Sequence, residues 1–213
     1  EKKSLSRKSE CIGHFVGLSG SDYPALVMGL NLQLPGALSG LSQAMAIHSN
    51  RFSYAFNLKG PSMTIDTACS ASLVTIHMSK LCLMDKTQDV EPTVANVVNG
   101  INLNLGPLPF QLTCAAGMLS RKGRCFTFDK SADGYVRGEA CGARCFKPQQ
   151  FNPDEGSIGL LAGSNVNQDG RSASLTAPNG PSQSSSIMAV MRECGVSPQE
   201  VDASECHGTG TAL

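Results

Sequence analysis

The sequence predicts an α/β fold, in which short strands and helices alternate along the chain. Strand-like stretches recur between turn residues: residues 14–18, 94–100 and 158–166 are largely apolar, and residues 62–66 alternate polar and apolar side chains. Between these stretches, apolar residues recur at the spacing of helices that bury one face. The 22 glycines and 11 prolines among 213 residues indicate a fold with many tight turns.

The first part of the chain predicts one strand and two helices. The ten N-terminal residues are polar and charged, and we expect them to be frayed. Residues 14–18 then form a short apolar strand. Pro24 begins a helix through Leu30, because proline is favoured in the first turn of a helix. Apolar residues at helical spacing predict a second helix over residues 41–56, in which His48 has a capping or solvent-exposed role.

Residues 60–84, GPSMTIDTACSASLVTIHMSKLCLM, are the centre of the prediction. They predict a strand at 62–66, a tight turn of small residues at 67–72, and a helix that continues to residue 84. A side chain in such a turn lies at the start of a helix, whose N–H groups favour a thiolate. Cys69 is therefore a candidate nucleophile, as in a nucleophile elbow. The alternative is a buried structural cysteine, the commoner fate of a free thiol.

The middle of the chain predicts, in order, a buried strand, a Gly/Pro-rich loop, a short helix, a turn-rich stretch and one or two strands: residues 94–100, 102–110, 112–119, 126–134 and 135–146. Arg144 in the last of these is expected at an exposed edge, since a buried arginine needs an anionic partner. A polar, Pro-containing connection at residues 148–156 joins the two halves of the chain.

The last part predicts a strand at 158–166, a helix that ends at Cys194 before the stop signal Gly195, and a short strand at 201–205. Both Cys69 and the motif that follows residue 205 then lie just past the carboxyl ends of strands. In open α/β sheets, that edge is where ligands bind.

His207 is a second candidate catalytic residue. It stands in the turn Cys206-His207-Gly208-Thr209-Gly210-Thr211, whose glycines let the backbone approach a ligand and whose threonines offer hydroxyls. With Cys69 it forms a possible Cys/His pair for nucleophilic catalysis, and the alternative is a loop histidine without a role.

His77 comes eight residues after Cys69, roughly 12 Å along the same helix, so we expect it to be structural. Ser70 and Ser72 are expected to cap and start that helix.

Composition excludes several classes of function. The 17 Lys and Arg balance the 17 Asp and Glu, so no nucleic-acid or anionic-membrane footprint is expected. No apolar run is long enough to span a bilayer, and no secretion signal is visible. The nine cysteines are then expected to be reduced thiols of a protein that is not secreted, in the cytoplasm or an organelle stroma. A zinc site at Cys141 and Cys145 lacks a second ligand pair, so no metal is expected.

Four motifs together resemble a known family: GPSMTIDTACSASL, FDKSADGYVRGEACG, NQDGRSASLTAPNGP and ECHGTGT. Their order and spacing are similar to those of β-ketoacyl synthases, and more narrowly to the ketosynthase domains of type I polyketide synthases. The resemblance implies the thiolase-like fold, a five-layered αβαβα arrangement of two halves. Residues 1–150 then form the N-terminal half and residues 151–213 the beginning of the C-terminal half, so we expect a partial sequence cut at both ends.

The resemblance also implies roles for four residues. Cys69 matches the nucleophile that takes the growing acyl chain as a thioester, and His207 matches the first of two active-site histidines. Thr209 and Thr211 match hydroxyls that hold the phosphopantetheine arm of an acyl carrier protein. Malonyl-carrier protein is decarboxylated and condensed onto the acyl chain, which forms a β-ketoacyl product. No directly bound cofactor is implied, and a homodimer is expected.

The resemblance leaves alternatives open. The second histidine of the family and its lysine are expected after Leu213, so the chain by itself is expected to be inactive. A fatty-acid β-ketoacyl synthase, a non-catalytic partner that binds carriers or sets chain length, and a Cys/His hydrolase are the competing interpretations.

Overall fold

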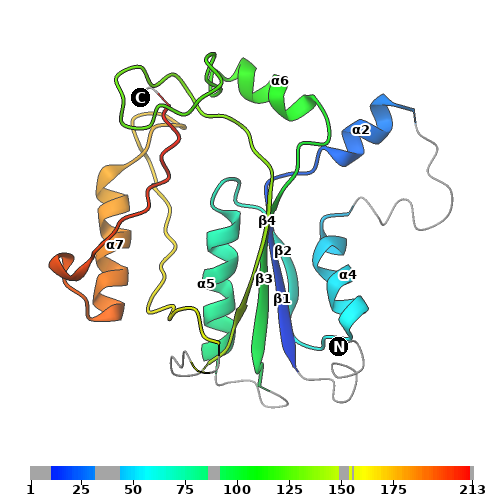
Figure 1. The fold of residues 1–213 in the computed structure, drawn as a ribbon, viewed down its shortest axis with the longest axis vertical. Helices are drawn as coiled ribbons and strands as arrows, with labels where there is room; N and C mark the ends of the chain where they lie inside the picture. The colour runs from blue at the N-terminus through cyan, green and yellow to red at the C-terminus, as the bar shows by residue number, and fades with distance from the viewer. Residues whose placement is uncertain (1–10, 32–43, 86–91, 149–153, 155, 212–213) are drawn as a thin grey trace.

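Four strands form one mixed sheet in the computed structural model, which describes residues 11–31, 44–85, 92–148, 154 and 156–211 (Figure 1). The strands are β1 (Ile12–Leu18), β2 (Ser62–Ile65), β3 (Ala95–Asn102) and β4 (Ala140–Phe146), in the order β2-β1-β3-β4. β1 pairs in parallel with β2 and β3, while β3 pairs antiparallel with β4. The helices are α2 (Tyr23–Gly29), α4 (Ala46–Phe56), α5 (Ala71–Met84), α6 (Leu108–Ala115) and α7 (Gly180–Cys194), with a short 3₁₀ helix, η2 (Pro198–Glu200).

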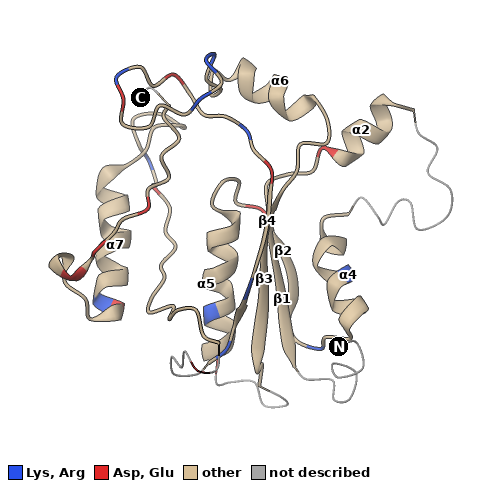
Figure 2. Cartoon of the chain, in the orientation of Figure 1, with Lys and Arg blue, Asp and Glu red and all other residues tan. Residues whose placement is uncertain are grey.

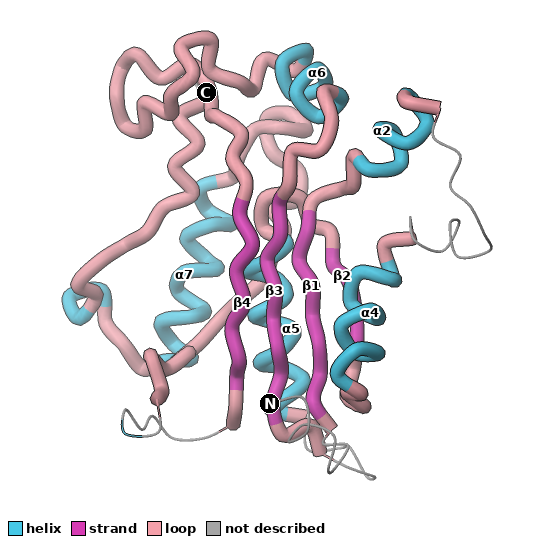
Figure 3. The backbone as a smooth tube through the Cα atoms, turned by 45° about the vertical axis from the view of Figure 1, so that its right-hand side comes forward, coloured by secondary structure: helices cyan, strands magenta, loops and turns pink. Residues whose placement is uncertain are grey.

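Helices cover both faces of the sheet. α5 lies on one face and α4 on the other, on either side of the central strand β1 (Figures 1 and 3). Phe15 and Val16 of β1 are fully buried because both faces of this strand are covered. The predicted α/β alternation is therefore confirmed for the strand–turn–helix unit that ends in α5.

The contact between α5 and the sheet is unusually close because the side chains that meet there are small. Ala71, Thr75 and Ser79 are the buried residues of α5, and they recur every four positions on one face of the helix. A Cβ atom at Gly17 of β1 would lie 2.6 Å from the backbone of α5, so only glycine fits there. Leu73, on the opposite side of α5, is 69% exposed.

α4 is held on the sheet by a buried histidine that no sequence pattern indicated. His14 of β1 donates a hydrogen bond from Nδ1 to the carbonyl oxygen of Ser49, at 2.9 Å. Its ring stacks on Phe52, with 4.2 Å between ring centroids. The aromatic stack and the hydrogen bond together replace part of the hydration that the imidazole loses on burial.

A further layer is built on the other side of α5. The extended segment 158–166 runs between α5 and α7 (Figure 1). Ser164 links all three elements: its hydroxyl is 2.9 Å from His77 Nδ1, its carbonyl accepts from Lys80 Nζ, and its N–H donates to Glu193. The order from α4 to α7 is therefore helix, sheet, helix, extended segment, helix.

Two predicted strands are wrong. Residues 158–166 and 201–205 are extended but form no β-ladder with any strand among the described residues. A strand is stable only when its backbone N–H and C=O groups meet a neighbouring strand, which an apolar stretch alone does not supply. The predicted strand at 158–166 instead exposes apolar side chains such as Ile158 and Leu160.

Other boundaries differ more modestly. The helix expected at 112–119 is α6, which begins at Leu108 inside the predicted loop, because Pro109 in a first turn loses no hydrogen bond. The strand expected over 135–146 is limited to β4, where Arg144 is exposed on the edge of the sheet as expected. α4 begins at Ala46. The predictions for residues 1–10, for 41–43 and for most of the connection at 148–156 lie outside the described residues.

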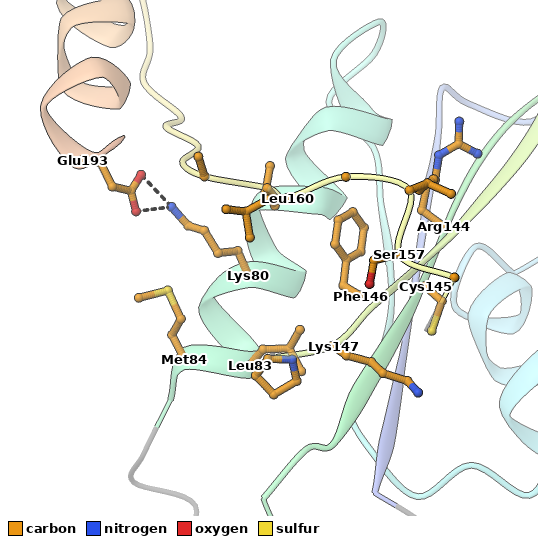
Figure 4. Close-up of a pocket in the computed structure, with 16 residues that line it drawn as sticks. Lys80, Leu83, Met84, Arg144, Cys145, Phe146, Lys147, Ser157, Leu160 and Glu193 are labelled. Atoms are coloured by element: carbon orange, nitrogen blue, oxygen red, sulfur yellow. Dashed lines mark hydrogen bonds and ion pairs between the residues drawn. The ribbon is translucent and has the colours of Figure 1, made fainter. Parts of the chain in front are cut away.

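The ion pair between Lys80 and Glu193 fastens α7 to α5, at one wall of an open cleft (Figure 4). Lys80 Nζ lies 2.6 and 2.8 Å from the two carboxylate oxygens of Glu193, and only 11% of the Lys80 side chain is exposed. Hydrogen bonds from Lys80 and then from the backbone N–H of Ser164 hold the pKa of Glu193 below its ordinary value of 4.5. A carboxylate whose folded pKa is lowered stabilises the fold above its ordinary pKa, and this contribution is lost as the pH falls through the folded pKa.

We therefore expect Lys80→Met to lower the urea midpoint near neutral pH. Below about pH 4.5, the urea midpoint of this variant should fall less steeply with decreasing pH than that of the unmodified protein. The measurement is urea unfolding of the full-length protein over a pH series. Lys147→Met is the matched control, since Lys147 is an exposed lysine that lines the same cleft. Equal effects of the two substitutions at all pH values would show that the ion pair does not stabilise this contact.

Within the described part of the chain, no helix has both the length and the apolar character that a bilayer crossing requires. Charged residues of both signs are spread along the loops and helices, in keeping with the zero formal net charge (Figure 2).

Candidate active site

Cys69 lies in a tight turn between β2 and α5. The residue before it, Ala68, has a left-handed backbone with φ of 54°, a conformation that costs a non-glycine residue roughly 1–3 kcal/mol. Asp66 holds the turn in place, because its carboxylate accepts hydrogen bonds from Ala68 N at 2.9 Å and from Gly20 N at 2.8 Å. The turn is therefore fixed to the end of β1 as well as to β2.

The turn presents the thiol of Cys69 to solvent at the start of α5. Cys69 is exposed, which contradicts the alternative of a buried structural cysteine. α5 begins at Ala71, two residues later, and its first backbone N–H groups have no partner within the helix. The positive end of the helix dipole favours negative charge at this position.

The capping role expected for Ser70 is wrong. Ser70 occupies the N-cap position, but its hydroxyl donates to the carbonyl and hydroxyl oxygens of Thr67, both at 2.9 Å, and does not accept from the helix. Ser72 lies in the first turn of α5, and its carbonyl accepts from Thr75. Ser70 therefore braces the turn around Cys69, and the N–H of Ala71, the first residue of α5, donates to the carbonyl of Ala68 at 3.1 Å.

His207 lies in an exposed loop whose shape depends on two glycines. Gly208 and Gly210 have φ of 59° and 65°, in the left-handed region. The hydroxyl of Thr127 donates to the carbonyl of Gly208 at 2.5 Å, and Gly134 N donates to the carbonyl of Gly210 at 3.0 Å. The FDKSADG stretch therefore serves as the support of the His207 loop, through a contact between residues 81 positions apart.

That support is itself rigid. Gly134 has φ of 140°, and a Cβ atom there would lie 2.5 Å from the backbone of Leu119. On either side of this contact, Tyr135 N donates to Met118 O and Ser120 N donates to Tyr135 O, each at 3.0 Å. Only glycine at position 134 can make this close approach.

The carboxylate of Asp129 stabilises a turn within the FDKSADG stretch. Asp129 accepts hydrogen bonds from the backbone N–H and the hydroxyl of Ser131, each at 2.7 Å. These two hydrogen bonds, the backbone one first, hold the pKa of Asp129 below its ordinary value of 3.8. Asp129 is therefore a turn-forming residue that remains ionised at neutral pH.

Thr209 and Thr211 are half-buried neighbours. Their Oγ1 atoms lie 3.2 Å apart, so the two hydroxyls share a hydrogen bond and face the same side of the loop. This pairing leaves lone pairs and one O–H for a ligand that approaches the loop.

The Cys69 turn and the His207 loop near the C-terminus lie at the same end of the molecule. The parallel strands β1, β2 and β3 have their carboxyl ends there (Figures 1 and 3). In the part of the chain that the structure describes, no hydrogen bond joins Cys69 to His207. His77 is bonded to Ser164 and so has the structural position that was expected of it. No cluster of three or more potential metal ligands occurs among the described residues.

Family models match almost the whole chain. The N-terminal domain of β-ketoacyl synthase matches residues 1–152, and the C-terminal domain of β-ketoacyl synthase matches residues 158–213. The chain belongs to the β-ketoacyl synthase family. The family resemblance inferred from the four motifs is thereby confirmed.

Relatives of this family member include several polyketide synthases. It is 42% identical over 203 residues to a phenolphthiocerol/phthiocerol polyketide synthase of Mycobacterium tuberculosis, an alignment that covers 94% of the chain and 10% of that protein. It is 39% identical to the non-reducing polyketide synthase mapC of Penicillium roqueforti, with 96% and 8% covered. The chain therefore spans a tenth or less of the length of these relatives.

Solved ketosynthase structures confirm the thiolase-like fold class. The ketosynthase from module 6 of the bacillaene synthase of Bacillus subtilis is 32% identical, with a TM-score of 0.83 over 99% of this chain and 35% of that one. An oxazolomycin ketosynthase domain of Streptomyces albus is 29% identical, with a TM-score of 0.85 and the same coverage. The chain spans about a third of each of these structures.

Proposed function

We propose that the chain is part of a polyketide-type ketosynthase, a β-ketoacyl-acyl carrier protein synthase that extends an acyl chain by decarboxylative Claisen condensation. The observation that carries the proposal is the exposed thiol of Cys69 at the start of α5, directly after the left-handed residue Ala68. A nucleophile needs access to a carbonyl, and the helix N-terminus supplies charge stabilisation without a metal ion.

The first half-reaction is acyl transfer to Cys69. The thiolate attacks the thioester carbonyl of an acyl-carrier protein, and the oxyanion that forms is stabilised by N–H groups at the start of α5. Collapse of this intermediate expels the thiol of the carrier's phosphopantetheine arm and leaves the acyl chain on Cys69. Thr209 and Thr211 are the proposed hydroxyl contacts of that arm, since they face one side of the loop beside His207.

The second half-reaction is condensation. Malonyl-carrier protein loses carbon dioxide, and the electron pair of the broken C–C bond becomes an enolate on the carrier thioester. His207 stabilises the enolate oxygen by hydrogen bonding. The enolate carbon attacks the acyl carbonyl, the new C–C bond forms, and the Cys69 thiolate leaves. This step also needs the second histidine that the resemblance implies, so residues 1–213 alone are proposed to be inactive in condensation.

The full-length protein, given acyl- and malonyl-carrier proteins, is expected to release carbon dioxide and to form a β-ketoacyl-carrier extended by two carbons. Mass spectrometry of the carrier together with carbon dioxide release measures this. A Cys/His hydrolase would release free acid from the acyl carrier with no extension, and a non-catalytic carrier-binding partner would bind the carriers and leave both unchanged. Either result would overturn the proposal.

A further inference from the structure

Two cysteines far apart in the sequence meet at one hydroxyl, at the opposite end of α5 from Cys69. Cys82 lies in the last turn of α5, and Cys11 directly precedes β1. The Sγ atom of each lies 3.7 Å from Oγ1 of Thr93. The two sulfur atoms are therefore separated by no more than twice that distance.

The two thiols lie in one interface, between α5 and the sheet. Cys82 follows the buried Ser79 by three positions, so it belongs to the face of α5 that contacts the sheet. Cys11 continues the ladder of β1, since its carbonyl accepts from Val94 N at 2.9 Å. Cys11 and Gly17 are an even number of positions apart, so their side-chain positions lie on the same face of the sheet. This face is the one next to α5, because a Cβ atom at Gly17 would lie 2.6 Å from the backbone of α5. Both side chains therefore face each other across the α5–sheet contact.

Both cysteines are half-buried, whereas Thr93 is buried. Each of the two cysteines therefore keeps part of its surface accessible to solvent. Neither has a role in the condensation proposed for Cys69, so the pair is independent of that proposal.

We propose that Cys11 and Cys82 form a redox-active dithiol whose disulfide ties the last turn of α5 to the start of β1. The oxidant is a small disulfide such as oxidised glutathione. The thiolate of one cysteine attacks it, which forms a mixed disulfide and expels one glutathione thiolate. The second cysteine attacks the protein sulfur of that mixed disulfide and expels the second glutathione. Two protein thiols are oxidised, and one glutathione disulfide is reduced to two thiols.

Formation of this disulfide requires both sulfurs to leave Thr93 and approach each other. The S–S bond length to be reached is about 2.05 Å. The weak thiol–hydroxyl hydrogen bonds to Thr93 are exchanged for a covalent link between two elements that are already in contact. The oxidised protein is therefore expected to be the more heat-stable form.

The test equilibrates the full-length protein in glutathione buffers of graded oxidised-to-reduced ratio, stops thiol exchange with acid, alkylates the remaining thiols with excess reagent near neutral pH, and maps the peptides by mass spectrometry. A cross-linked Cys11–Cys82 peptide is expected to accumulate as the oxidised fraction rises and to disappear with dithiothreitol. Cys11→Ser and Cys82→Ser eliminate it, while Cys114→Ser, which removes an exposed thiol of α6, retains it.

Peptide mapping of the unmodified protein shows whether the Cys11–Cys82 disulfide forms, even if a serine variant fails to fold. Glutathione adducts on Cys11 and Cys82 without a cross-link, or two thiols that stay reduced at every ratio, would overturn the proposal. A melting temperature that rises on oxidation in the unmodified protein, but not in Cys82→Ser, supports it.

Discussion

Replacement of Cys69 by alanine is expected to abolish the covalent acyl-enzyme and to lower condensation on the order of 10⁶-fold, as with other catalytic nucleophiles. Alanine keeps the small volume that the turn requires, so the strand–turn–helix unit should remain folded. What is lost is the thiol at the start of α5, which is the proposed acceptor of the acyl group. Intact-protein mass spectrometry after incubation with acyl-carrier protein measures the adduct directly.

The matched control is Cys141→Ala, which removes another exposed thiol from the edge strand β4. This variant should load acyl groups as the unmodified protein does. Acylation that persists in Cys69→Ala, or that is lost in Cys141→Ala, would place the nucleophile elsewhere and reject the assignment. Circular dichroism of both variants separates loss of chemistry from loss of fold.

The Cys69 turn was predictable because its causes are local. The β-branched strand residues, the run of small residues and the helical spacing all lie within residues 60–84, and each acts on its nearest neighbours. The left-handed backbone of Ala68 was not predictable in this way. It depends on Asp66, whose carboxylate reaches both Ala68 and the distant Gly20. Sequence patterns therefore located the candidate nucleophile, while the hydrogen bonds that fix its turn are seen only in the structure.

The two incorrectly predicted strands depend instead on contacts between residues far apart in the sequence. Residues 158–166 have the apolar composition of a strand, but a strand is defined by its partner, and partners are non-local. Here the segment is held by Ser164 through contacts to α5 and α7, which are separated from it by tens of residues. The buried His14 is a similar case, since its acceptor Ser49 lies 35 residues away. No local pattern marks either contact.

The support of the His207 loop was visible only in part. Glycines and aspartates in FDKSADG predict turns for local reasons, and the structure has those turns. The contact between Thr127 and Gly208 joins residues 81 positions apart, so no periodicity reports it. The one signal in the sequence was that both stretches belong to the same ordered set of motifs.

Replacement of His207 by alanine is expected to lower condensation by about 10²–10⁴-fold while acyl loading changes much less. Loading depends on a thiolate at the start of α5, and that helix is built without the 206–211 loop. Condensation depends on a charge that develops on the malonyl-derived enolate, which the imidazole is proposed to stabilise. Single-turnover loading and steady-state product formation, measured on one preparation of the full-length protein, give the two rates separately.

His48→Gln is the control for the loss of an imidazole, because His48 belongs to α4 on the face of the sheet that α5 does not cover. His207→Asn tests the mechanism further, since its amide retains a hydrogen-bond donor and should recover part of the condensation rate. Equal losses of loading and condensation in His207→Ala would mean that the histidine orders the loop or activates the thiol. A loss confined to condensation would mean that the two half-reactions depend on different parts of the chain. Acyl transfer would depend on the Cys69 turn, which Asp66 holds in place. Carbon–carbon bond formation would depend on the His207 loop, which Thr127 and Gly134 hold in place.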